Sequence, residues 1–112
     1  MNRNFTQAMS VRCSDPAKME QVIELLRQWD RDQAQADIMG YMGIRVLADR
    51  ETPDEYLILA DFGVVDPDVS AADEAARNND RPETQETARR MRELLDDDPV
   101  YRHYDWLYLT DG

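Results

Sequence analysis

The sequence predicts an α+β fold of the ferredoxin-like type, in which the element order βαββαβ builds a four-stranded antiparallel sheet. Two strand-like runs joined by a short polar turn occupy residues 41–62. A further strand-like run lies near each end of the chain, and a segment with helical spacing of apolar residues separates each of them from the central pair. At 112 residues, the chain is expected to form a single domain over residues 1–112.

The first strand and the first helix are predicted from two different periodicities. Apolar residues alternate over residues 4–13, which is typical of a strand with one buried face. A helix is expected to start at Ser14-Asp15-Pro16, because proline is favoured in a first turn, and to end between residues 30 and 37. Its apolar stripe contains Met19, Val22, Ile23, Leu25, Leu26 and Trp29. Trp29 is expected in the core, with a ligand pocket as the alternative.

Both strands of the central hairpin are apolar on both faces, although an antiparallel sheet with one wet face would alternate with polar residues. The first strand is predicted from Tyr41 and the second up to Phe62, with the polar turn 49–54 between them. Alternation places Tyr41 on the same face as Arg45. Arg45 and Asp61 are the only charges inside these strands, so we expect them to pair, across the hairpin or between subunits.

A second helical region is predicted to begin at Ser70, whose spacing to Asp73 fits a capping box. Pro82 should break this region, because the residue before a proline resists helical geometry. The new start would use Asp80 or Arg81 as its N-cap. The buried stripe of the longer helix is expected to contain Thr84, Ala88, Met91 and Leu95. The last strand is predicted over residues 101–109, again with large apolar side chains on both faces.

The apolar second face of the sheet predicts an assembly. Two helices can cover only one face of a four-stranded sheet, and an exposed apolar area of a few hundred Å² usually marks an interface. The simplest cover is the same face of a second copy, related by a twofold axis. The chain is therefore expected to bind itself as a homodimer through the sheet face.

Composition excludes several classes of function. The formal charge of −11 disfavours binding to nucleic acid and to anionic membranes. No apolar run reaches the ~18 residues of a membrane span, and the N-terminus lacks the apolar region of a signal peptide. The single cysteine, Cys13, fits a reducing compartment, so a cytoplasmic location is expected. We find no glycine-rich phosphate loop, zinc motif or nucleophile elbow, and expect neither a metal nor a cofactor.

The chain resembles the dimeric α/β-barrel superfamily, in particular its antibiotic-biosynthesis-monooxygenase-like (ABM-like) proteins. The element order carries the resemblance along the whole chain, and a local match lies at Glu74-Ala75, followed by Asn79 and by Arg81-Pro82. Members often have a histidine near the position of Asn79 and a Ser-Pro pair where this chain has Arg81-Pro82. They also often have a tryptophan before the Glu-Ala pair, and this chain lacks that tryptophan. The resemblance implies a cleft between helices and sheet that in some members hosts cofactor-free oxidation of aromatic substrates. Other members degrade haem with that histidine, which Asn79 replaces here.

Four residues are candidates for a site in this cleft. His103, the only histidine, and Asn79 are predicted to be catalytic, since imidazole exchanges protons near neutral pH and an amide both donates and accepts hydrogen bonds. Asn78 and Arg81 are predicted to bind a small-molecule ligand. Each also has a structural alternative, such as ending a helix or pairing on the surface. Two functions follow: a cofactor-free monooxygenase-like enzyme for a small aromatic or polyketide-like substrate, or a non-catalytic ligand-binding or structural dimer.

Overall fold

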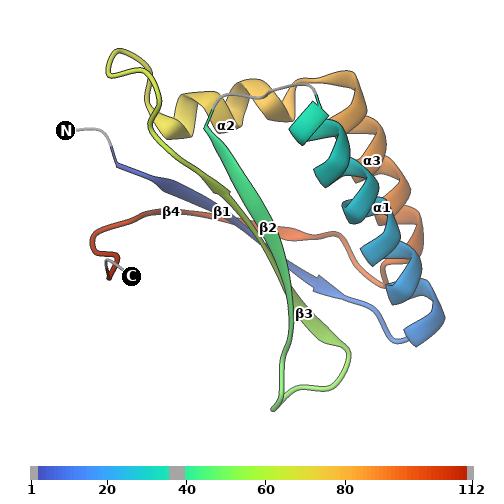
Figure 1. Ribbon diagram of the computed structural model, residues 1–112. Coiled ribbons are helices and arrows are strands. Elements are labelled where there is room, and N and C mark those ends of the chain that lie inside the picture. The colour runs from blue at the N-terminus through green and yellow to red at the C-terminus, as the bar shows by residue number, and fades with distance from the viewer. Residues whose placement is uncertain (1–2, 36–39, 111–112) are drawn as a thin grey trace.

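The protein is described here by a computed structural model that covers residues 3–35 and 40–110. The helices lie against one face of a four-stranded sheet, as Figure 1 shows. The elements in order are β1 (Phe5–Arg12), α1 (Pro16–Gln35), β2 (Tyr41–Ala48), β3 (Glu55–Phe62), α2 (Ala71–Asn79), α3 (Pro82–Leu94) and β4 (Val100–Asp105). All pairings are antiparallel, in the order β2-β3-β1-β4. The predicted βαββαβ plan is confirmed, with its second helical region divided into α2 and α3.

The three helices begin where the sequence predicted. Asp15 accepts a hydrogen bond from the backbone N–H of Ala17 at 2.9 Å, just before Pro16 starts α1. The Ser70 hydroxyl accepts from the backbone N–H of Asp73 at 3.0 Å, which satisfies one of the free donors of α2. Of the two N-caps considered for α3, Arg81 is the one used.

A β-bulge corrects one prediction in β2. The register between β2 and β3 shifts between Tyr41 and Gly43, and Gly43 has φ +129°, a conformation that glycine adopts at little cost. The extra residue reverses the alternation, so Tyr41 turns towards the helices. There its ring contacts Trp29 edge-on, with the ring centroids 5.3 Å apart. The prediction that Tyr41 shares a face with Arg45 is therefore wrong.

The last strand is shorter than predicted. β4 ends at Asp105 instead of residue 109, because Asp105 lies opposite Phe5, where β1 itself begins. The backbone of Trp106 still donates to Asn4 at 2.8 Å, but beyond it no strand remains to pair with. The residues that follow are exposed, and Tyr108 has 83% of its surface free.

A chain of polar contacts crosses the face of the sheet that the helices leave open. The Trp106 indole N–H donates to the Thr6 hydroxyl, and that hydroxyl donates to Asp61, both at 2.6 Å. Asp61 in turn pairs with Arg45 at 3.6 Å. The predicted Arg45–Asp61 pair is confirmed, and it forms within one chain.

Several exposed or partly exposed side chains on the open face are apolar. Leu47 on β2 is 43% exposed and Tyr104 on β4 is 50% exposed, while Leu57 and Leu59 lie between them on β3 and are partly exposed. The core lies on the other side of the sheet. One cluster joins β1, β3 and the helices through Val11, Cys13, Met19, Val22, Leu26, Ile58, Met91 and Leu95. Within residues 3–35 and 40–110, no helix is both long and apolar enough to cross a bilayer.

Candidate functional site

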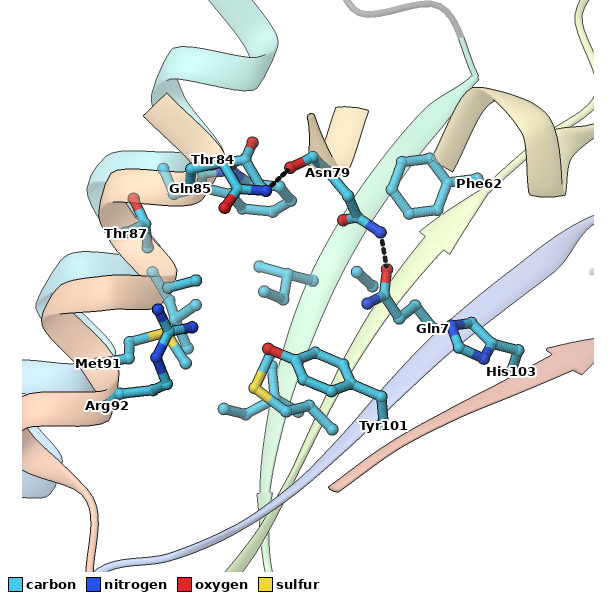
Figure 2. A pocket seen from close by; sticks show the side chains of 17 residues that line it. Gln7, Phe62, Asn79, Thr84, Gln85, Thr87, Met91, Arg92, Tyr101 and His103 are labelled. Atoms are coloured by element: carbon cyan, nitrogen blue, oxygen red, sulfur yellow. Dashed lines mark hydrogen bonds between the residues drawn. The ribbon is translucent and has the colours of Figure 1, made fainter. Parts of the chain in front are cut away.

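A pocket of about 450 Å³ lies between the sheet and helices α1 and α3 (Figure 2). Its apolar walls come from the strands β2 and β3 and from the inner faces of the two helices. The main contributors are Leu26, Ile44, Ile58, Phe62 and Met91. A cavity of this size and lining is typical of a binding site for a small organic molecule.

Asn79 and His103 both line this pocket, although they are 24 positions apart along the chain. Asn79 ends α2, and its side-chain amide donates to Gln7 on β1 at 3.2 Å. The side-chain amide of Gln85 on α3 donates a hydrogen bond to the backbone carbonyl of Asn79, as Figure 2 shows. On β4, the His103 ring stacks on Phe5 with 5.7 Å between the centroids. The two predicted catalytic residues are thus held on different elements around one cavity.

The two predicted ligand-binding residues lie elsewhere. Asn78 is 2% exposed and does not line the pocket, and neither polar atom of its side chain has a partner among the described residues. Arg81 also lies outside the lining and pairs with Glu83. Their role in binding a ligand stays a prediction.

Trp29 combines the two roles that the sequence left open. Its ring is buried and forms part of the pocket wall, and its indole N–H donates to the Thr84 hydroxyl at 2.9 Å. Behind it, the Tyr41 hydroxyl donates to Asp30. Burial, followed by this hydrogen bond, raises the pKa of Tyr41 far above its ordinary value, so the phenol stays neutral. The wall is therefore fixed in position from both sides.

Sequence reasoning missed several polar residues of the pocket. Gln7, Gln85, Arg92 and Tyr101 all line it. The alternation of side chains along the strands could have identified Gln7 and Tyr101. Gln7 points to the same face as the core residue Phe5, and Tyr101 points to the same face as His103. The position of Arg92 depends on how α3 packs on the sheet, for which the sequence has no local signal.

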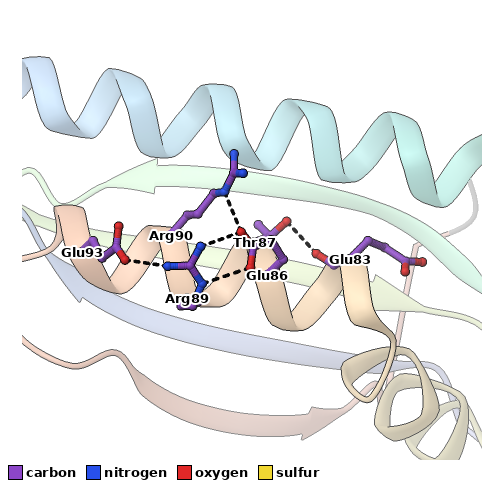
Figure 3. Close-up of polar contacts among 6 residues, drawn as sticks. All are labelled: Glu83, Glu86, Thr87, Arg89, Arg90 and Glu93. Carbon is purple, nitrogen blue, oxygen red and sulfur yellow. Dashed lines mark hydrogen bonds and ion pairs between the residues drawn. The ribbon is translucent and has the colours of Figure 1, made fainter.

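The arginines of α3 have different surroundings, and Figure 3 shows the two that form ion pairs, Arg89 and Arg90. Arg89 pairs with Glu86 at 2.6 Å and with Glu93 at 2.7 Å, and Arg90 pairs with Glu86 at 2.9 Å. Hydrogen bonds from Arg89 and then Arg90 lower the pKa of Glu86 to about 2. Arg92 makes no ion pair with any described residue and faces the pocket.

Replacing Glu86 by Gln should reduce the thermal midpoint at pH 7 slightly, because both arginines lose their shared partner while helix propensity hardly changes. The folded-state pKa lies below the ordinary value of 4.5, so this stabilisation is complete above pH 4.5 and is lost as the pH falls towards 2. Melting curves from pH 7 to pH 2.5 should show the two proteins converging. The control is Glu20→Gln, an exposed α1 residue that forms no ion pair with any other residue in the described part of the chain. A difference that grows on acidification would contradict the assignment.

Neither a cluster of metal ligands nor a sequence relative identifies the site. Among the described residues, no group of three or more His, Cys, Asp or Glu side chains is placed to hold a metal ion. No family model matches the sequence, and no curated protein matches it.

Solved structures do match the fold. A candidate antibiotic biosynthesis monooxygenase from Nitrosomonas europaea superposes with a TM-score of 0.75 at 13% identity, covering 99% of this chain and 97% of its own. A mutant of SnoaB, a cofactor-independent oxygenase from Streptomyces nogalater, gives 0.71 at 16% identity, covering 98% and 99%. The chain has the ABM-like fold. A dimeric ferredoxin-like protein of unknown function from Thermobifida fusca also matches, with a TM-score of 0.68 at 18% identity, covering 95% and 93%. The ABM-like fold therefore spans nearly the whole chain.

Proposed function

We propose that the protein is a homodimeric, cofactor-free oxygenase that acts on a small hydroxy-aromatic substrate in the pocket. The observation that carries the proposal is the convergence of Asn79 and His103 on one largely apolar cavity. The resemblance to SnoaB, described as a cofactor-independent oxygenase, supports the reaction class. We further propose that it works in the cytoplasm.

The chemistry constrains the substrate. Without a cofactor, the electrons that reduce O₂ must come from the substrate itself. A hydroxy-arene such as 1-naphthol supplies four electrons, so that one oxygen atom enters a quinone product and the other leaves as water. The substrate becomes reactive when its hydroxyl loses a proton. Hydrogen-bond donors held in fixed positions in an apolar pocket then stabilise the negative charge on the substrate as the reaction proceeds.

The two residues would divide this work. His103 accepts the hydroxyl proton, since a neutral imidazole is a base of suitable strength near pH 7. Asn79 uses one amide N–H on Gln7, and an amide has a second that can donate to the developing anion. Gln85 and Gln7 hold Asn79 at its carbonyl and at its side chain, so the donor is preorganised.

Asn79→Ala should lower kcat roughly 10²–10³-fold, as removal of a single preorganised donor does in other enzymes. Oxygen uptake with a panel of hydroxy-arenes, in the presence of a chelator, measures this. Gln28→Ala removes an exposed amide from α1 and should leave the rate unchanged. If the double variant Asn79→Ala/His103→Ala still turns over the substrate at the wild-type rate, the residue assignment is wrong. A protein that binds aromatics and never consumes oxygen would instead be the non-catalytic binding dimer.

The open face of the sheet supports the proposed dimer. A stable interface buries about 1,200–2,000 Å² in total, and this face offers exposed or partly exposed apolar side chains on β2, β3 and β4, among them Leu47, Leu57 and Tyr104. Its polar side chains Thr6, Asp61 and Trp106 are already hydrogen-bonded to one another, so these three keep their partners when the face is covered. We propose a second copy of this chain as the cover, as in the dimeric protein from Thermobifida fusca.

A further inference from the structure

The pocket is free of acidic groups in a strongly acidic protein. Asp and Glu account for 24 of the 112 residues, and the formal charge is −11. None of the 17 lining residues within the described part of the chain is acidic, whereas Arg92 and His103 are both among them. The charge that surrounds a bound molecule is therefore opposite in sign to that of the whole surface.

Arg92 is the cation in the pocket lining that can attract an anionic ligand. Its neighbours on the same helix, Arg89 and Arg90, are neutralised by Glu86 and Glu93. Arg92 has no such partner among residues 3–35 and 40–110, although three carboxylates lie on α3 itself. A guanidinium that stays unpaired in a chain with an excess of carboxylates is available to an external anion.

Two donors line the pocket from opposite sides. Arg92 comes from α3 and Tyr101 comes from β4, and both are exposed residues. In Figure 2 the Arg92 guanidinium and the Tyr101 hydroxyl approach the pocket from opposite walls. Most of the remaining lining is apolar, and its polar members include Asn79 and Gln7. The arrangement suits a molecule with an apolar body and one acceptor group at its outer end.

We propose that the substrate is an aromatic carboxylic acid, held by its carboxylate between Arg92 and Tyr101. The planar guanidinium donates two parallel N–H groups, which match the two oxygens of a carboxylate. The inference rests on the proposed function, because it takes the same pocket as the substrate site. It adds that the ring enters with its hydroxyl towards Asn79 and its carboxylate towards solvent.

The test compares 2-naphthoate with 2-naphthamide, two ligands of nearly the same shape that differ in charge. Isothermal titration of the full-length protein should show 2-naphthoate binding about tenfold more tightly. Arg92→Gln should remove this preference and leave the affinity for 2-naphthamide unchanged. Arg90→Gln, on the same helix and outside the pocket lining, should keep the preference. Raising the salt concentration should reduce it, since Arg92 is exposed.

Equal affinity for the two ligands in the wild-type protein would overturn the inference, as would a preference that survives Arg92→Gln or the failure of both ligands to bind. The proposed function fails on a different observation. If 2-naphthoate binds with the Arg92-dependent preference and no hydroxy-naphthoate consumes oxygen, the carboxylate site stands and the oxygenase assignment falls. If neutral hydroxy-arenes are oxidised and the preference is absent, the reverse holds.

Discussion

Replacing Leu57 by Asp should convert the proposed dimer into a monomer. Leu57 lies on the open face of the sheet, and its cross-strand partners are Leu47 on β2 and Ser10 on β1. No cation is directly opposite, so a carboxylate there would be buried without a partner against the second copy. At ~25 cal/mol per Å² of apolar surface, the interface is worth many kcal/mol, and an unpaired buried charge offsets a large part of that.

Light scattering on a sizing column measures the change. The wild-type protein should have about twice the chain mass of 13.1 kDa, and the variant should have the chain mass itself. Val65→Asp is the matched control, because Val65 is also an exposed apolar residue but lies in the loop after β3. A Leu57→Asp protein that keeps the double mass would show that copies associate through another surface.

Replacing Phe62 by Ala should cost about 3–5 kcal/mol of unfolding free energy, the usual range for a buried phenylalanine. Phe62 is 1% exposed, packs with Phe5, Ala71 and Ala75, and meets Tyr41 edge-on at 5.8 Å. Because its ring also forms part of the pocket wall, the variant joins a new void to the existing cavity instead of collapsing around it. The loss is a large part of the 5–15 kcal/mol that stabilises most domains.

Urea unfolding at one fixed protein concentration measures this loss, since the stability of a dimer depends on concentration. Phe62→Leu should recover most of the stability, because it restores most of the buried volume. Val65→Ala, three residues further and exposed, should change it little. A cost of less than 1 kcal/mol for Phe62→Ala would mean that this ring does not hold the helices to the sheet.

Local signals in the sequence were sufficient for the element order. Pro16 and Ser70 mark helix starts through interactions within three residues, and the alternation in β1 and β3 survives intact in the structure. The Arg45–Asp61 pair was also accessible, since a charge within an apolar strand needs a partner and only one was available.

Features that depend on long-range packing were not accessible in this way. The bulge at Gly43 has no distinctive local motif, so Tyr41 was assigned to the wrong face. The end of β4 is set by where β1 begins, about 100 residues earlier. The hydrogen bond between Gln7 and Asn79 joins residues 72 positions apart, and it appears only when α2 packs on the sheet. The composition of the pocket, including Arg92, follows from such contacts.

The two tryptophans make the central claim directly measurable, because Trp29 lies in the pocket wall and Trp106 on the open sheet face. In a ¹H–¹⁵N NMR titration with 1-naphthol, the indole signal of Trp29 and the side-chain amide signals of Gln7 and Asn79 should move together, while the Trp106 indole stays in place. Movement of Trp106 with no change at Trp29 would contradict a site between the helices and the sheet.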